Sequence, residues 1–161
     1  MPSLTVETEI SAPVDLVFDL ARDVGAHCAT AAFTQERAVA GVIEGRLALG
    51  DEVTFEAVHL GFRQRLAARI VEFERPVRFV DEMLTGAFES LRHEHAFQAV
   101  ARGTVMRDTL TWRSPLGLLG RLADRLVVAR HLGSFLRRRN ANLKHLAEAA
   151  VAVAAQPVIP P

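Results

Sequence analysis

The clearest pattern in the chain lies in its final third, where apolar residues recur every three or four positions from residue 117 to about residue 150. This spacing predicts one long amphipathic helix with a single apolar face. The face consists of Leu119, Leu122, Leu126, Ala129, Gly133, Leu136, Asn140, Leu143 and Ala147. Gly133 and Asn140 interrupt its aliphatic character. A glycine inside a helix costs about 1 kcal/mol relative to alanine, so it marks the close approach of a sheet side chain or of a ligand.

Before this helix, apolar and polar residues alternate, as they do in strands with one buried face. The first strand is expected over residues 4–10, and two short helices follow it, over residues 14–21 and about 26–32. Ser11 and Pro13 provide a capping hydroxyl and a helix start for the first of them. About six further strands, separated by short turns with glycine or proline, are expected before the long helix.

This order of elements predicts the fold class. Antiparallel neighbours on short turns form a meander, so the helices must lie together on one face of the sheet. We therefore predict an α+β protein in which a curved antiparallel sheet of about seven strands wraps around a long C-terminal helix. A single domain is expected over residues 1–148, followed by a frayed or disordered tail over residues 149–161, which is rich in small residues and proline.

Composition and charge narrow the range of partners. The 161 residues include 19 basic and 19 acidic side chains, so no net charge favours nucleic acid or an anionic membrane. The single cysteine, Cys28, excludes an internal disulfide and fits a reducing compartment. The N-terminus lacks the pattern of a secretory signal, and no apolar run approaches the ~20 residues that span a bilayer. We expect a cytoplasmic protein without stable membrane insertion.

Strand alternation also predicts which side chains face the interior between sheet and helix. The apolar ones are Val53, Phe55, Leu66, Ile70, Leu91, Phe97, Met106, Leu110 and Trp112. Polar residues share the same faces, namely His59, Gln64, His93, His95 and Asp108, together with either Asp81 or Glu82. Burying an unpaired polar group costs roughly 1–3 kcal/mol, so we expect these residues to pair with one another, with water or with a ligand.

Several motifs resemble the START-like helix-grip superfamily, which includes polyketide cyclase/dehydrase proteins, coenzyme Q-binding proteins and pollen-allergen ligand carriers. The motifs are ISAPVDLVF at 10–18, LGDEVTFEA at 49–57, RFVDEM at 78–83, RHEHAF at 92–97 and SPLGLLGRLAD at 114–124. They resemble a bacterial branch often described only as cyclase/dehydrase or SRPBCC proteins, and the resemblance covers residues 1 to roughly 148. Because carriers, cyclases, hydrolases and regulators share this scaffold, the resemblance implies the fold more strongly than the function.

Three interpretations of the inward polar residues stay open. The first is a structural network in which Asp108 orients a histidine. The second is ligand recognition, because apolar walls with a few convergent polar groups are typical of a small-molecule site. The third is a metal site, in which His93 and His95, two positions apart on a strand, reach one ion that His59 or Asp108 also binds. We favour the first two and expect neither a metal nor a cofactor.

The predicted function is the binding of a hydrophobic or amphipathic small molecule, such as a lipid, quinone or polyketide, between the sheet and the long helix. The expected ligand-binding residues are Phe55, His59, Gln64, Leu66, Leu91, His93, His95, Met106, Asp108, Leu110, Trp112, Gly133, Leu136 and Asn140. One alternative is a cyclase, dehydratase or hydrolase in which His95 and Asp108 transfer a proton. Another is a protein-interaction module with a filled core. A homodimer is compatible with all three.

Three further groups are expected to have no special role. The run Arg137-Arg138-Arg139 is interpreted as a solvated edge of the long helix. His27 and His131 are expected at the surface or at a helix edge. Arg63 and Arg65 lie on the solvated face of their strand, where neighbouring carboxylates can neutralise them.

Overall fold

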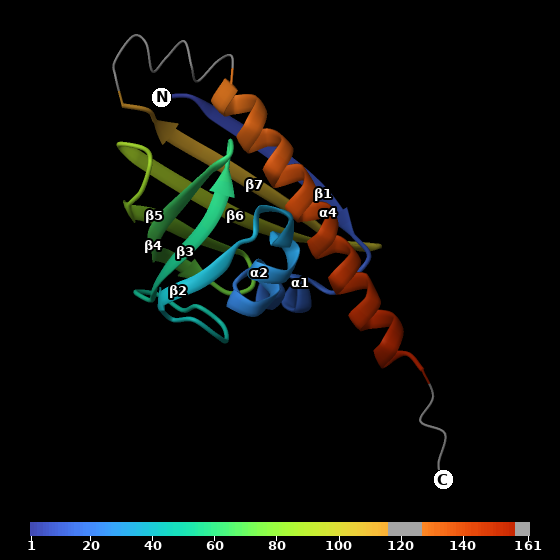
Figure 1. The fold of residues 1–161 in the computed structure, drawn as a ribbon. Helices are drawn as coiled ribbons and strands as arrows, with labels where there is room; N and C mark the ends of the chain where they lie inside the picture. Colours follow the sequence, from blue (N-terminus) through green and yellow to red (C-terminus); the bar gives the residue numbers. More distant parts are fainter. Residues whose placement is uncertain (116–126, 157–161) are drawn as a thin grey trace.

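The computed structural model describes residues 1–115 and 127–156. Its strands are β1 (Ser3–Ile10), β2 (Arg37–Gly41), β3 (Glu52–His59), β4 (Phe62–Glu74), β5 (Arg78–Thr85), β6 (Ser90–Val100) and β7 (Gly103–Arg113). Its helices are α1 (Val14–Ala21), α2 (Val24–Thr30), the 3₁₀ turn η1 (Ala32–Thr34) and α4 (Ala129–Ala154). The strands form one antiparallel sheet in the order β1-β7-β6-β5-β4-β3-β2. The predicted α+β architecture is confirmed, and Figure 1 shows α4 crossing one face of the sheet alongside β1.

The first two helices begin differently from the prediction. Pro13 is the N-terminal cap of α1 and no side chain of a described residue caps this helix, so the capping role expected for Ser11 is wrong. Instead, the backbone N–H of Ser11 donates to Glu148 Oε1 at 2.8 Å, which ties the end of β1 to α4. Asp23 caps α2 by accepting a hydrogen bond from the backbone N–H of Ala26 at 2.8 Å. For this reason α2 starts at Val24, ahead of the expected position.

The turns before β4 and β7 contain residues with positive φ values. Leu60 and Gly61 both have positive φ values, 52° and 82°, as a tight hairpin between β3 and β4 requires. Gly103 opens β7 at a φ of 137°, and a Cβ there would lie 2.2 Å from the carbonyl oxygen of Ile10. A glycine at this position therefore lets the turn between β6 and β7 approach the end of β1.

The long helix α4 extends further than predicted at its C-terminal end. It continues to Ala154 instead of ending near residue 150, so the first residues of the expected tail are helical. Leu136, Leu143 and Ala147 lie on its buried face, as the pattern predicts. The predicted N-terminal turns of the helix, with Leu119, Leu122 and Leu126, lie outside the described residues, as does the end of the chain from residue 157.

The interior between sheet and helices is filled at one end by aromatic side chains. Phe18 of α1 is fully buried, and the rings of Phe73, Phe79 and Phe97 meet it edge-on at 5.1–5.5 Å. Such edge-to-face pairs contribute about 0.5–1.5 kcal/mol each beyond the area they bury. Phe18 of α1 and its aromatic neighbours therefore close one end of this interior. The other end, between the sheet and the first turns of α4, is less densely filled.

Candidate functional site

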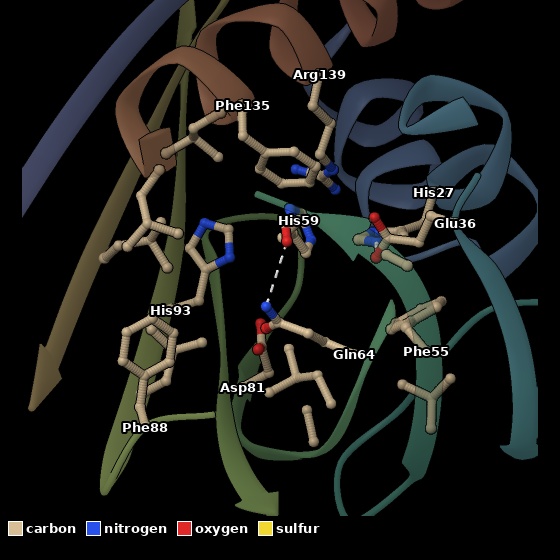
Figure 2. Close-up of a pocket in the computed structure, with 18 of the residues that line it drawn as sticks. His27, Glu36, Phe55, His59, Gln64, Asp81, Phe88, His93, Phe135 and Arg139 are labelled. Atoms are coloured by element: carbon tan, nitrogen blue, oxygen red, sulfur yellow. Dashed lines mark hydrogen bonds and ion pairs between the residues drawn. The ribbon is translucent and has the colours of Figure 1, made fainter. Parts of the chain in front are cut away.

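A pocket of about 440 Å³ lies between the sheet and the first turns of α4 (Figure 2). Its walls come from β3, β4, β5 and β6, with one residue of β7, and from the segment Val128–Arg139 and the start of α2. This volume lies within the range of roughly 300–1,000 Å³ that is typical of small-molecule sites. The pocket therefore occupies the end of the interior that α1 does not fill.

Most of the predicted ligand-binding residues line this pocket. They are Phe55, His59, Gln64, Leu66, Leu91, His93, His95, Leu110 and Leu136. The others do not line it: Met106, Asp108, Trp112, Gly133 and Asn140. Met106 belongs to the aromatic core and Trp112 packs with Leu136 in a second cluster. The atoms nearest to a Cβ on Gly133 would belong to the guanidinium of Arg137 on the same helix, so neither a sheet side chain nor the pocket makes the closest approach to this glycine.

Apolar side chains form most of the pocket wall, including several that strand alternation could not predict. Phe88 precedes β6, and Leu132 and Phe135 come from the beginning of α4. The Phe135 ring meets the His59 ring edge-on at 5.3 Å, and Figure 2 shows both side chains directed into the pocket. These residues are on a loop and on a helix face, so the alternating pattern of the strands does not reveal them.

Asp108, on β7, is completely buried directly behind the pocket wall. Its carboxylate accepts hydrogen bonds from Asn140 Nδ2 at 2.6 Å and from His93 Nε2 at 3.1 Å. His95 lies opposite Asp108 in the pairing of β6 with β7, and its Nδ1 is 2.5 Å from Asp108 Oδ1, away from the direction of a good hydrogen bond. Asp108 therefore orients the His93 imidazole by a hydrogen bond and lies against His95 as its counter-charge, both from outside the pocket.

The pKa values of the two histidines in this cluster shift in opposite directions. Burial opposes the charged forms of Asp108 and His95, but their mutual attraction outweighs it, so the pKa of Asp108 lies well below its usual value and that of His95 is raised. For His93, burial and the nearby charge of His95 lower the pKa. A neutral His93 donates Nε2–H to Asp108, and its Nδ1 keeps a lone pair.

The choice between Asp81 and Glu82, which the sequence left open, is now settled. Asp81 lines the pocket, and its Oδ2 accepts a hydrogen bond from His95 Nε2 at 3.3 Å. Burial alone would raise the pKa of Asp81, but the hydrogen bond from His95 and the neighbouring histidine charges lower it. Glu82 faces away from the pocket and accepts a hydrogen bond from Arg92 Nη1 at 2.8 Å.

Two histidines that we expected at the surface belong to the pocket instead. His27 Nε2 is 2.8 Å from Oε1 of Glu36, whose side chain is only 7% exposed, and the His27 ring stacks on Phe55 at 4.2 Å. His131 Nε2 is 3.1 Å from His59 Nδ1, and burial lowers the pKa of both of these histidines. Glu36 precedes β2 on a stretch without alternation, so no sequence signal indicates its position.

The position of Arg139 differs most from the one that the sequence predicted. We expected it at a solvated edge, but it is 2% exposed and lines the pocket. Its position three residues after Leu136 and four before Leu143 is the available signal, because this spacing lies on the buried face. Within the described residues, the buried side-chain nitrogen and oxygen atoms without a hydrogen-bond partner are His95 Nδ1, Asn140 Oδ1, and Nε and Nη1 of Arg139. All of them lie in or beside the pocket.

Comparison with solved structures supports the helix-grip fold. A Thermus thermophilus protein aligns with a TM-score of 0.77 at 21% identity, covering 92% of this chain and 99% of its own. A Chromobacterium violaceum protein aligns at 0.69 and 13% identity, over 91% of this chain and 96% of its own. Major latex-like protein 151 of Panax ginseng aligns at 0.70 and 11% identity, over 91% of this chain and 97% of its own. At these identities the likeness establishes the fold alone.

Comparisons of the sequence complete the assignment. No curated protein matches the chain significantly. The described residues include no helix that is long and apolar enough to cross a membrane. Residues 1–148 match the family described as polyketide cyclase/dehydrase and lipid transport, which confirms the resemblance found in the sequence. The chain belongs to the polyketide cyclase/dehydrase and lipid transport family.

Proposed function

We propose that this protein binds one amphipathic small molecule in the pocket between the sheet and α4. The observation that carries the proposal is the combination of mostly apolar walls with a buried arginine, Arg139, whose Nε and Nη1 have no hydrogen-bond partner among the described residues. Membership of a family described by cyclase/dehydrase activity and lipid transport supports a lipophilic ligand. The pocket volume also speaks against an interaction module with a filled core.

The apolar wall supplies affinity for the hydrocarbon part of the ligand. Leu66 and Leu91 of the sheet line the pocket and are partly buried, and Leu110 of β7 and Leu136 of α4 line it as buried residues. Covering apolar surface contributes roughly 25 cal/mol per Å². This term does not depend on the detailed shape of the ligand, so it favours a lipophilic body without selecting one compound.

The polar part of the ligand is positioned by Arg139. A buried guanidinium with unpaired N–H groups is unfavourable in the free protein, since burying a charge is costly unless it is paired and fully hydrogen-bonded. A ligand oxygen that accepts from Nε and Nη1 removes this cost, and the gain appears as binding affinity. Glu36 lies near enough to interact electrostatically with Arg139, which limits the net positive charge here. A carbonyl, hydroxyl or carboxylate oxygen therefore fits the position.

Displacement of a fluorescent fatty acid, followed by native mass spectrometry, tests the proposal. We expect one probe per chain, displaced by lipophilic compounds that carry an acceptor oxygen and less well by hydrocarbons of the same length. Leu66→Trp places a large ring in the pocket and is expected to reduce probe affinity at least tenfold. Leu84→Trp is the matched control, because Leu84 is 43% exposed and outside the pocket.

Two results would contradict the proposal. One is a purified protein that binds no probe and carries no extractable compound. The other is equal probe affinity in the Leu66→Trp and Leu84→Trp variants, since binding would then occur outside the pocket. The cyclase, dehydratase or hydrolase alternative stays a separate prediction, and it requires turnover of a bound compound in addition to binding.

A further inference from the structure

Three side chains on one wall of the pocket have the spacing of metal ligands. Asp81, His93 and His95 each offer one donor atom, and these atoms lie within 4.8 Å of one another. Asp81 and His93 are direct partners in the pairing of β5 with β6, and His95 follows on the same side of β6. The 3.3 Å between His95 Nε2 and Asp81 Oδ2 matches the separation of about 3.3 Å between ligands in a tetrahedral zinc site with bonds of 2.0–2.1 Å.

A carboxylate behind the wall contacts both imidazoles: it accepts a hydrogen bond from His93 and is the counter-charge of His95. Asp108 contacts His93 through Nε2 and His95 through Nδ1, and Asn140 in turn holds Asp108. The other nitrogen of His95, Nε2, faces Asp81 Oδ2 at 3.3 Å, and the other nitrogen of His93, Nδ1, is not used in the contact with Asp108. Metal-binding histidines commonly use their second nitrogen in this way, with a carboxylate that fixes the ring and raises its basicity.

We propose that Asp81, His93 and His95 bind one divalent transition-metal ion, with zinc as the ion that fits best. Two imidazoles and one carboxylate are zinc-type ligands, whereas magnesium and calcium require mainly oxygen ligands. Two carboxylates, Asp81 and Asp108, meet in this cluster, so a divalent ion also offsets their charge. Three protein ligands leave a fourth position, which faces the pocket.

The third ligand differs from both candidates suggested by strand alternation. His59 Nδ1 is occupied by His131 at 3.1 Å, in a different part of the pocket. Asp108 contacts the histidines from behind and does not line the pocket. Asp81 takes this place, and Figure 2 shows Asp81 and His93 on the same side of the pocket, both pointing into it. The exposed fractions of their side chains, 23% and 14%, leave access for an ion.

Zinc titration of metal-free protein, purified without a histidine tag and in competition with a chromophoric chelator, tests the site. We expect one zinc ion per chain in the wild type. Asp81→Asn and His93→Gln should each weaken zinc binding at least 100-fold, and Asp108→Asn should weaken it about tenfold through the loss of orientation. Glu82→Gln, on the outer face of β5, and His145→Gln, on an exposed part of α4, should bind zinc as the wild type does.

X-ray absorption spectroscopy of the zinc-loaded wild type provides a second measurement that does not depend on the folding of any variant. The spectrum is expected to show two imidazole ligands and at least one oxygen ligand bound directly to zinc. Substoichiometric zinc binding by the wild type, a first shell without two imidazoles, or unchanged affinity in folded Asp81→Asn and His93→Gln variants would each overturn the proposal.

The proposed metal site and the proposed binding of an amphipathic ligand are tested independently in these experiments. Zinc titration uses the ion alone, and the probe assay uses metal-free protein. Loss of zinc binding with normal probe binding would remove the metal site and leave the proposed function standing. The reverse result would support the metal site and remove the proposed function.

Discussion

The two faces of the sheet hold their charges in different ways. On the outer face, Glu56 accepts hydrogen bonds from Arg37, Arg63 and Arg65. These partners lower the pKa of Glu56 to about 2. Between the sheet and α4, several buried atoms have no hydrogen-bond partner among the described residues: Nδ1 of His95 on the inner face of the sheet, and atoms of Arg139 and Asn140 on the side of α4 that faces it. The outer carboxylate has several strong donors, whereas the inner guanidinium has no acceptor for its Nε and Nη1 among the described residues.

This difference indicates which polar groups serve the fold and which serve function. On the outer face, exposed ion pairs such as Arg92–Glu82 contribute about 0–1 kcal/mol each. Glu56 on the same face is itself buried, but the three arginines that bind it satisfy its carboxylate. Buried polar groups that lack partners lower stability, so they are retained where a ligand or ion completes them. The under-satisfied inner face is therefore the better guide to function, and the predictions below test this contrast from the largest expected effect to the smallest.

Asp108→Ala should have the largest effect on stability. The change leaves His95 without its main counter-charge and removes the acceptor for His93 and Asn140, and breaking such a buried pair costs about 3–5 kcal/mol. Urea unfolding followed by circular dichroism measures the loss. A cost below about 1 kcal/mol would show that the inner cluster does not stabilise the protein and would remove the contrast between the faces.

Asp19→Asn tests whether burial or the kind of partner decides the contribution of a carboxylate. Asp19 is buried, as Asp108 is, but its partners are arginines, as they are for the carboxylates of the outer face. The hydrogen bond from Arg75, together with the charges of Arg22 and Arg46, lowers the pKa of Asp19 to about 2 from 3.8. Since the folded pKa is depressed, its stabilisation is complete above pH 3.8 and is lost as the pH falls through 2. We expect a loss of about 2 kcal/mol at pH 7.

The stability difference between wild type and Asp19→Asn should shrink as the pH falls from about 5 to about 2 in urea titrations. Asp15→Asn is the control, because Asp15 is 60% exposed and pairs only with Arg75 among the described residues. A difference that stays constant over this pH range would mean that Asp19 does not gain its stabilisation from ionisation.

Arg139→Met should separate stability from binding. Nε and Nη1 of this buried cation have no hydrogen-bond partner among the described residues. Replacing it by an apolar side chain of similar length should therefore leave the free energy of unfolding unchanged or raise it by about 1 kcal/mol. The same change should weaken ligands with an acceptor oxygen about tenfold. Thermal unfolding and probe displacement on one preparation measure both effects. A destabilised variant with normal binding would place Arg139 among the structural groups.

Glu82→Gln should have the smallest effect. Glu82 is 47% exposed and its hydrogen bond to Arg92 lies on the outer face, so we expect a change in unfolding free energy within about 0.5 kcal/mol. Urea unfolding under the conditions used for Asp108→Ala gives the direct comparison. A loss similar to that of Asp108→Ala would show that the outer network carries as much stability as the inner cluster.

Strand alternation predicted much of the candidate site. It placed Phe55, His59, Leu91, His93 and His95 on inward faces, and all of them line the pocket. Its period of two depends only on the geometry of one strand, so it holds without knowledge of the neighbours. Alternation did not predict which inward side chains line the pocket, because it cannot distinguish residues of the pocket wall from residues packed behind that wall. Asp108 and Met106 share the inward side with His95 but lie behind the wall or in the core.

The sequence by itself determined the order of elements, the antiparallel meander and the apolar face of the last helix, because turns, strand periods and helix periods are local properties of the chain. Only the tertiary structure decided which groups meet. Glu36 pairs with His27 of α2, and Asp81 lies beside His93 and His95 of the neighbouring strand. The side chain of Arg139 lies in the pocket and not at a solvated edge of α4. These contacts depend on strand register and on the placement of α4 over the sheet, which local patterns do not encode.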